Sequence, residues 1–467
     1  MINRTIAQLA GLFVLIFLLI AVRQAYVQVV AGPAISERSG NPRHAVVDPN
    51  RGRILATDGS VLAATQNGAR TYPLGPALAQ TVGYLSTRYG TSGIEDAYDL
   101  ALSPTDTSGD PVAQFQQIVD SFQGKQGVSK GADVVTTIVP AIQARLFAEL
   151  SRYSRGAGVV LDPRSGAVLA LASVPSFDPN DIDALFPQLN TDASSPLLNR
   201  AIDGLYPPGS TFKIFTASAA LDSGTVTMAS TFYDPGYLEV GNFTLHNNES
   251  EVTGTADLTT AFALSSNVDF AQIALKMGVD TFYDYLSKFG IGESPDFQLP
   301  ASRDGVPLKS DIVPGELAQM GFGQGALLMT PLRMALLGAT IADDGNEPRP
   351  YIVRQIVRDG AIASVYPSEA LATPISADTA AGVKKMMEAV VARGTGTTAR
   401  IQGVTVAGKT GTATNPEGRA HSWFVCFAPA ENPRFAVAVV VENGGYGADV
   451  AAPIARDVLQ TALGNVK

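Results

Sequence analysis

The residues with the clearest capacity for chemistry lie in the segment 207–213 (PPGSTFK). Its two prolines and glycine end any preceding element, and the apolar residues that follow predict a helix over 210–223. Residues i and i+3 share one face of a helix, so the Ser210 hydroxyl and the Lys213 amine can approach each other. A serine hydroxyl becomes a good nucleophile when a neighbouring base takes its proton. The spacing therefore indicates a nucleophilic Ser210 with Lys213 as its base.

The composition favours a lysine in that role. The 467 residues include three histidines and one cysteine, Cys426, which are too few soft ligands for a Cys/His zinc site. We expect neither a metal nor another cofactor, so catalysis would rest on serine, lysine and carboxylates. Burial in an apolar turn lowers the pKa of Lys213 because the ammonium loses hydration, and a second cation nearby lowers it further.

Two further motifs could complete a site with this pair. The tripeptide 265–267 (SSN) lies between two predicted helices and places a hydroxyl and an amide on the loop that joins them. The segment 408–412 (GKTGT) follows a strand predicted at 404–408. Alternation along a strand puts Lys409 and Gly411 on one face, where the glycine leaves space for a substrate against the strand edge.

One competing interpretation concerns nucleotides. Residues 403–410 (GVTVAGKT) match the phosphate-loop pattern G-x-x-x-x-G-K-T. A phosphate loop needs a flexible turn followed by a helix whose N-terminus faces the phosphate. Here three of the four variable residues are β-branched and predict a strand, and 411–416 (GTATNP) cannot open a helix. A net charge of −10 without any basic run also argues against nucleic acid as a partner.

The elements that must position these motifs predict an α+β fold. Strands are predicted near both ends of the larger domain, at 158–161, 167–172, 404–408, 421–428 and 435–442. Helices are predicted between them, at 210–223, 257–264, 269–277, 332–342 and 378–393, with a last one at 454–463. This order predicts an antiparallel sheet closed by both chain ends, with a helical subdomain inserted.

The N-terminal region predicts a membrane anchor. Residues 6–22 form an apolar run in which Gln8 is the only strongly polar residue, and Arg4 and Arg23 flank it. At ~1.5 Å per residue, a helix of this length is about 26 Å long and lies near the short end of what spans a bilayer. A cleaved signal peptide is the alternative, although its apolar region usually has only ~7–15 residues. We expect 1–31 to be a single-pass anchor.

The rest of the chain divides into two predicted domains outside the cytoplasm. Residues 32–155 predict a small β-rich pedestal, because Asp58 and Gly59 join two short strands as a turn. We find no residues there whose types and spacing indicate chemistry. Residues 156–467 contain all three motifs and form the predicted catalytic domain.

In their order and context, the three motifs together resemble those of penicillin-binding proteins and serine β-lactamases. The resemblance to class B penicillin-binding proteins runs from about residue 50 to the C-terminus, and the anchor fits it. It includes the segments 51–54 (RGRI), 58–59 (DG), 93–95 (GIE) with Asp99, 161–166, 175–180 (PSFDPN), 199–201 (NRA), 323–325 (GQG) and 330–331 (TP). The short region before the catalytic domain is most similar to compact members of that class.

The resemblance implies a peptidoglycan D,D-transpeptidase in cell-wall synthesis, anchored in the bacterial cell membrane with its catalytic domain outside the cytoplasm. Its serine attacks the penultimate D-Ala carbonyl of a stem pentapeptide, releases the terminal D-Ala and passes the acyl group to the amine of a neighbouring stem. β-Lactams would be covalent inhibitors. The region before residue 156 is too short to hold a glycosyltransferase domain as well, so the family suggests a SEDS-type membrane polymerase as partner.

The family's site residues can be carried over position by position. The resemblance implies that Ser210 is the nucleophile and Lys213 the general base, and that Ser265 and Asn267 relay protons and hold the substrate amide. Lys409 would supply the like charge that helps to keep Lys213 neutral.

The third motif would bind the end of the substrate. The resemblance implies that Lys409 and the hydroxyls of Thr410 and Thr412 bind the terminal carboxylate, with Gly411 between them against the substrate. The backbone N–H groups of Ser210 and Thr412 would form the oxyanion hole.

Other functions on the same fold remain open at this stage. A D,D-carboxypeptidase differs only in whether water or an amine accepts the acyl group. A class A β-lactamase would need a Glu-x-x-Leu-Asn segment between Asn267 and Lys409, and none is present. A class D β-lactamase uses a carboxylated form of the same lysine, and a non-catalytic sensor would only be acylated by penicillin. The acceptor amine and a role in elongation, division or sporulation are not specified by these motifs.

Overall fold

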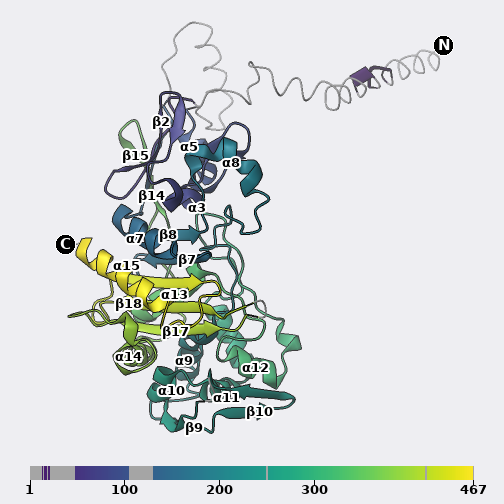
Figure 1. Cartoon of the computed structure of the whole chain (residues 1–467), viewed down its shortest axis with the longest axis vertical. Helices are drawn as coiled ribbons and strands as arrows, with labels where there is room; N and C mark the ends of the chain where they lie inside the picture. The colour runs from purple at the N-terminus through teal and green to yellow at the C-terminus, as the bar shows by residue number, and fades with distance from the viewer. Residues whose placement is uncertain are drawn as a thin grey trace, which may run out of the picture.

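A computed structural model describes residues 48–104, 130–248, 251–415 and 418–465, together with six residues of a helix between Phe13 and Ile20. The molecule is elongated, with a pedestal at one end, a large sheet in the middle and a helical subdomain at the other end (Figure 1). Most of the predicted anchor, 1–31, lies outside the described residues. Within the described part, we find no helix with the length and apolar character needed to cross a bilayer.

The middle of the molecule is a five-stranded sheet in which every neighbouring pair is antiparallel. In spatial order its strands are β17 (Ala407–Ala413), β18 (His421–Ala428), β19 (Phe435–Val441), β7 (Gly156–Leu161) and β8 (Val168–Val174). Because β19 pairs with β7, both ends of the catalytic domain meet in one sheet, as predicted. Nearly all side chains of the sheet are buried, since helices cover both of its faces.

Three helices make up these covering layers. One face carries α7 (Pro140–Leu150) and the C-terminal α15 (Ala451–Asn465), and the other carries α13 (Pro331–Ala342). The apolar face of α7, formed by Ile142, Leu146 and Leu150, is fully buried in the core beneath the sheet. This helix lies inside the segment predicted as pedestal, yet it packs on the catalytic sheet.

The helical subdomain holds the first two motifs. Its elements are η5 (Gly209–Phe212), α9 (Lys213–Asp222), α10 (Leu258–Leu264), α11 (Asn267–Lys288), η7 (Lys309–Asp311), α12 (Pro314–Met320), α14 (Ala377–Arg393) and η8 (Thr397–Ala399). Two small antiparallel pairs close its far end: β9 (Thr231–Asp234) with β12 (Gly254–Asp257), and β10 (Tyr237–Val240) with β11 (Phe243–His246). Helix α14 packs between β17 and α10, and thereby brings the second and third motifs together.

Two predicted boundaries differ from the structure. Strand β17 starts at Ala407 instead of residue 404 and includes the whole segment 408–412, because the strand continues along the edge of the sheet. Helix α11 was predicted to end at residue 277, whereas it continues to Lys288 across a kink at Gly278, whose φ of 77° is not helical.

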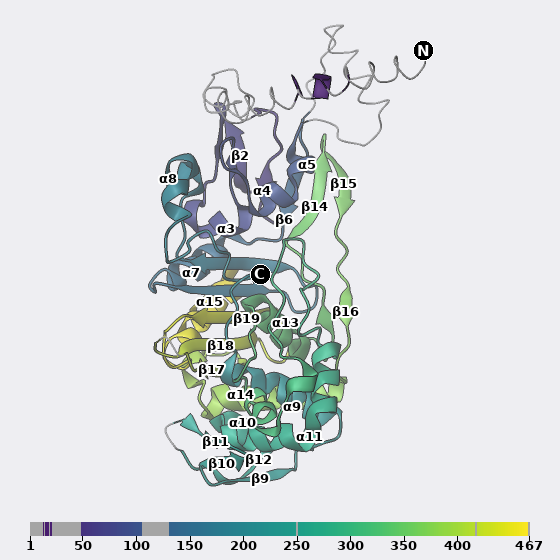
Figure 2. The same cartoon turned by 90° about the vertical axis from the view of Figure 1, so that its right-hand side faces the viewer.

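The pedestal is built around a six-stranded sheet, ordered β15-β14-β6-β1-β2-β3. Four strands come from the N-terminal region: β1 (Ile54–Leu55), β2 (Val61–Gln66), β3 (Ala69–Thr71) and β6 (Asp133–Thr136). The other two, β14 (Val353–Arg358) and β15 (Ala361–Val365), form a hairpin that extends from the catalytic half alongside the pedestal (Figure 2). The sequence predicted strands from the N-terminal region here. It did not predict that β14 and β15, from the catalytic half, would join the same sheet.

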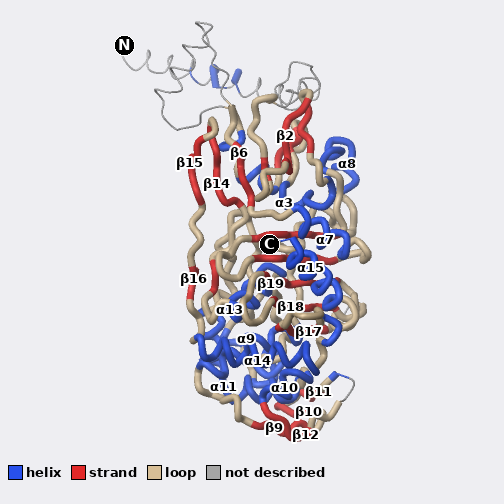
Figure 3. The backbone as a smooth tube through the Cα atoms, turned by 90° about the vertical axis from the view of Figure 1, so that its left-hand side faces the viewer, coloured by secondary structure: helices blue, strands red, loops and turns tan. Residues whose placement is uncertain are grey.

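Short elements connect these parts, as the tube view shows (Figure 3). They are η3 (Gly75–Leu78), α3 (Ala79–Val82), β4 (Leu85–Ser86), β5 (Gly90–Thr91), α4 (Gly93–Ala97), α5 (Asp99–Leu102), η4 (Pro179–Asp181), α8 (Ile182–Leu189), β13 (Glu347–Pro348) and β16 (Ala370–Ala372). Within the pedestal, the fully buried Glu95 binds both Arg51, at 2.9 Å, and Arg70, at 2.6 Å. Two of the segments noted in the sequence, 51–54 and 93–95, thus meet in one buried ion-pair cluster.

Candidate active site

The Ser210 turn lies directly against the edge strand β17. Gly209 has a φ of 54°, and its N–H donates to the Gly323 carbonyl at 2.9 Å, which fixes the start of η5. On the strand side, a Cβ atom at Gly411 would lie 2.9 Å from Thr211 Cγ2 and 3.0 Å from the Pro208 carbonyl oxygen. The space beside Gly411 is therefore filled by the turn that carries Ser210. Gly411 was predicted to leave space for a substrate, and here it allows this close approach instead.

Lys213 follows one 3₁₀ turn after Ser210, so the two residues lie on the same side of the chain. Its side chain is fully buried. Its Nζ donates to the Ser265 carbonyl at 2.6 Å and to Asn267 Oδ1 at 2.8 Å, and it lies 3.3 Å from Ser265 Oγ. The lysine predicted to approach Ser210 thus makes its hydrogen bonds to the 265–267 loop in this structure.

Lys409 approaches the same loop from the sheet. It is also fully buried, and its Nζ donates to Ser265 Oγ at 2.8 Å and to the Thr410 carbonyl at 3.2 Å. Ser265 Oγ therefore lies between the two lysine nitrogens. Ser265 can reach this position because it ends α10 with a φ of 66°, a left-handed conformation that turns the chain sharply before α11.

Burial controls the charge of both lysines. Burial lowers the pKa of Lys409 to about 7. It also lowers the pKa of Lys213 well below its usual value, and the positive charge of Lys409 lowers it further, while Asp269 and Asp234 act in the opposite direction. A neutral Lys213 has two N–H bonds and one lone pair. The Ser265 carbonyl and Asn267 Oδ1 can accept the two N–H bonds, which leaves the lone pair available to a hydroxyl proton.

A brace behind the loop, which sequence reasoning missed, holds Asn267 in place. Asn247 Oδ1 accepts from the backbone N–H groups of Asn267, at 2.8 Å, and Val268, at 3.1 Å, and so caps α11 from outside the helix. The amide of Asn247 is oriented by Asp234 Oδ2, at 2.6 Å, which also accepts from Ser266 Oγ at 2.8 Å. Asp234 ends the short strand β9 and Asn247 directly follows β11, so no spacing rule marks them.

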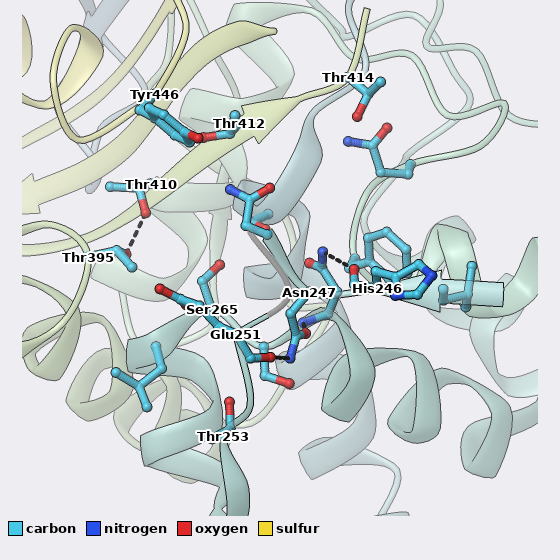
Figure 4. A pocket seen from close by; sticks show the side chains of 18 of the residues that line it. His246, Asn247, Glu251, Thr253, Ser265, Thr395, Thr410, Thr412, Thr414 and Tyr446 are labelled. Carbon is cyan, nitrogen blue, oxygen red and sulfur yellow. Dashed lines mark hydrogen bonds between the residues drawn. The ribbon is translucent and has the colours of Figure 1, made fainter. Parts of the chain in front are cut away.

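Residues of all three motifs surround a cavity of about 680 Å³ (Figure 4). Ser210 and Ser265 line it, together with Asn267, Thr410 and Thr412. Thr410 Oγ1 lies 2.6 Å from Thr395 Oγ1, and Thr412 Oγ1 accepts from the Gly447 N–H at 3.4 Å. Of the predicted site residues, only Lys213, Lys409 and Gly411 do not line the cavity; the two lysines contact its wall from behind.

The described residues match neither the geometry of a nucleotide site nor that of a metal site. Residues 407–413 form a strand that continues past the GKT segment, so the loop and helix of a nucleotide site do not follow it. Within the described part of the chain, no three His, Cys, Asp or Glu side chains group as metal ligands would. The arrangement is suited to nucleophilic attack by a serine, because a hydroxyl faces the cavity and an uncharged amine can lie behind it.

Comparisons with known families agree with this geometry. The family model described as penicillin binding protein transpeptidase domain matches residues 156–460, and the one described as penicillin binding protein A dimerisation domain matches 51–134. The first match covers well over half of the chain. The chain therefore belongs to the penicillin-binding proteins, in class B.

Named relatives cover most of the sequence, and one covers nearly all of it. The peptidoglycan D,D-transpeptidase PbpA of Mycolicibacterium smegmatis is 33% identical over 99% of both chains. The peptidoglycan D,D-transpeptidase MrdA of Haemophilus influenzae is 32% identical over 80% of this chain and 63% of its own.

Solved structures show the same fold. The D,D-transpeptidase domain of a peptidoglycan glycosyltransferase from Eggerthella lenta superimposes with a TM-score of 0.80 at 36% identity, covering 90% of this chain and 99% of that one. The penicillin G acyl-enzyme complex of penicillin-binding protein A from M. tuberculosis also gives 0.80, at 32% identity, over 89% of this chain and all of the other.

Proposed function

We propose that this chain is a peptidoglycan D,D-transpeptidase that cross-links stem peptides through an acyl intermediate on Ser210. The observation that carries the proposal is the convergence of two buried lysines on Ser265 beside the cavity that Ser210 lines. The relatives named above as D,D-transpeptidases support the reaction class, and the penicillin G complex of a 32% identical protein supports acylation by β-lactams.

Acylation begins with proton transfer from Ser210 Oγ to the lone pair of a neutral Lys213. The Oγ atom then forms a bond to the penultimate D-Ala carbonyl carbon, and the carbonyl oxygen takes the negative charge. The backbone N–H groups of Ser210 and Thr412 are the donors that we assign to this oxyanion, and each such donor typically contributes about 2.7–4 kcal/mol. Thr410 and Thr412, with the charge of Lys409 behind them, hold the terminal carboxylate.

The leaving group needs a proton at its nitrogen. The ammonium of Lys213 returns one through Ser265 Oγ, which lies 3.3 Å from Lys213 and also accepts from Lys409 at 2.8 Å. The amide bond then breaks and D-Ala leaves. In the second half, the amine of another stem attacks the acyl carbonyl and loses its proton to the same lysine. Lys213 passes this proton to Ser210 Oγ as the bond between Oγ and the acyl carbon breaks, so Ser210 is released and the cross-link is formed.

We place this reaction outside the cytoplasm, on a protein held in the cell membrane by residues 1–31. Two points support that location. The apolar run at 6–22 can anchor the chain, and the peptidoglycan substrate lies outside the cytoplasm. A glycan polymerase must supply the strands, and the family resemblance supports a SEDS-type membrane protein in that role. Co-purification of the full-length chain with such a polymerase, compared with a variant lacking 1–31, tests the partner.

Labelling with a fluorescent penicillin tests the function itself. We expect a covalent, long-lived adduct on the wild type and none on Ser210→Ala. A stem pentapeptide mimic offered with an amine acceptor should then give the cross-linked product. Release of free acid instead of cross-link would identify a carboxypeptidase, rapid turnover of the penicillin a β-lactamase, and an adduct without peptide turnover a sensor.

A further inference from the structure

Asp269, which the mechanism above does not use, lies in the first turn of α11 behind the catalytic loop. The residue is fully buried, and neither carboxylate oxygen has a hydrogen-bond partner in the described part of the chain. The nearest hydroxyl is already engaged: Ser266 Oγ accepts from the Asp269 backbone N–H at 3.0 Å and donates its proton to Asp234 Oδ2 at 2.8 Å. A buried acid without a hydrogen-bond donor is costly, so its presence needs a reason.

The charged groups around Asp269 suggest a reason for its buried position. Burial raises the pKa of Asp269 to about 6 and Asp234 adds to the rise, while the Ser266 hydroxyl and the positive charge of Lys213 oppose it. The carboxylate is therefore mostly ionised at neutral pH, and its place in the first turn of α11 also favours negative charge. Among the charged groups that act on Lys213, Lys409 from β17 disfavours its ammonium form, while Asp269 from α11 and Asp234 from β9 favour it.

The two acids differ in how much of their charge is available. The Asp234 oxygens accept hydrogen bonds from Ser266, Asn247 and the Gly236 N–H. Among the described residues, the Ser266 hydroxyl is the one donor group that acts on Asp269, and it already donates to Asp234, so less of the Asp269 charge is compensated by donors. Burial and Lys409 alone would make Lys213 a very weak base, and a general base is most effective when its pKa lies near the working pH.

We propose that Asp269 is a positioning residue for the base, whose negative charge keeps Lys213 basic enough to take the proton of Ser210. This inference rests on the proposed function, because it assumes that Lys213 activates Ser210. It adds to that function a residue that acts through Lys213 and does not touch the substrate.

Acylation needs neutral Lys213, so its rate rises with pH as the lysine loses its proton. Removing a nearby negative charge destabilises the ammonium form and lowers the pKa of Lys213. The rise should therefore move to lower pH, and the plateau rate should fall because the base is weaker. The difference from wild type should be largest above about pH 6, where Asp269 itself is ionised.

The test is the pH dependence of acylation by a fluorescent penicillin, compared for wild type, Asp269→Asn and Asp284→Asn. The first variant removes the charge with almost no change in shape and breaks no side-chain hydrogen bond between described residues. The second makes the same charge change at an exposed position of the same helix. We expect the midpoint of Asp269→Asn to fall by about half a pH unit or more, with a several-fold lower plateau, and that of Asp284→Asn to match wild type.

Two results would overturn the proposal. One is a folded Asp269→Asn whose midpoint equals that of wild type, and the other is a midpoint that moves to higher pH. A lower melting temperature without a shifted midpoint belongs to the first case, since it indicates a structural role. If Asp269→Asn is too unstable to assay, Asp269→Ser removes the same charge and tests the same shift. Loss of labelling in wild type would instead contradict the proposed function, independently of Asp269.

Discussion

At the scale of single residues, the site depends on two amines held out of water around one hydroxyl. Lys213 and Lys409 are both fully buried and both lie within hydrogen-bonding distance of Ser265 Oγ. Two cations so close would repel each other, so at most one of them is readily protonated near neutral pH. Burial lowers the pKa of both lysines, and the charge of Lys409 lowers that of Lys213 further, which fits the proposed role of Lys213 as a neutral base.

Replacing Lys409 by methionine should shift the pH dependence of acylation in the direction opposite to Asp269→Asn. The positive charge of Lys409 lowers the pKa of Lys213, so its removal lets that pKa rise. The rate of penicillin labelling should then rise at a pH higher than in wild type, by about half a unit or more. A midpoint that moves to lower pH would contradict the assigned coupling between the two lysines.

Asn247→Ala tests the brace behind Asn267. Loss of Asn247 leaves the N–H groups of Asn267 and Val268 without their acceptor, and helix caps of this kind contribute about 1 kcal/mol. We expect a tenfold or greater loss of labelling rate, because Asn267 is a hydrogen-bond partner of Lys213, together with a lower melting temperature. Asn190→Ala, at an exposed helix end, is the control. Equal rates for Asn247→Ala and wild type would rule out a role for the brace.

At the scale of elements, the site exists because a turn, a loop and a strand edge are packed closely together. The turn that carries Ser210 fits against β17 only where that strand has no side chain, at Gly411. Helix α14 then fixes the distance between β17 and α10, from which Ser265 projects. Small changes in this packing should affect reactivity more than they affect folding.

The variant Gly411→Ala tests the close packing of the Ser210 turn against β17. The added methyl group would lie 2.9 Å from Thr211 Cγ2 and from Trp423 Cβ, so the turn must move away from the strand. We expect an unfolding free energy lower by about 1–3 kcal/mol and a labelling rate lower by an order of magnitude or more. Gly464→Ala, where nothing lies within 4 Å of the new atom, should leave both unchanged. A wild-type labelling rate for Gly411→Ala would show that the contact does not matter.

Most of the helices and strands could be predicted from the sequence, but several contacts between them could not. The three motifs, the strands of the five-stranded sheet and most helices were predictable, because apolar periodicity and turn residues are local signals. The role of Gly411 was misjudged because a sequence does not show which neighbour fills the space beside a glycine. Asn247, Asp234 and Asp269 were missed because their importance comes from contacts between residues 13 or more positions apart or from burial, and neither leaves a pattern in the sequence.

At the scale of the whole molecule, the pedestal and the catalytic domain are joined through shared structure. The β14–β15 hairpin leaves the catalytic half and pairs with β6, with Val353 opposite Thr136. Such pairing is long-range in sequence, which is why the predicted division at residue 155 did not anticipate it. The pedestal sheet is stabilised further by the buried Glu95 cluster.

Glu95→Ala should destabilise the pedestal while leaving the catalytic cavity intact. Arg51 and Arg70 would keep their buried charges without this carboxylate, and breaking a buried ion pair in this way costs about 3–5 kcal/mol. A thermal melt should show a lower first transition, whereas penicillin labelling at low temperature should persist. Asp280→Ala, which removes an exposed partner of Lys309, should change stability by less than about 1 kcal/mol. A melt unchanged in Glu95→Ala would contradict the role of the cluster.

The shared hairpin also limits how this protein can be divided or recombined. A fragment that ends before the catalytic domain would contain β1, β2, β3 and β6 but would leave the β6 edge unpaired, and exposed strand edges promote self-association. A chimaera that exchanges the N-terminal region with that of a relative would have to fit the foreign strand to the native β14. The pedestal unit that could be exchanged is therefore discontinuous in sequence, because it must include residues 353–365.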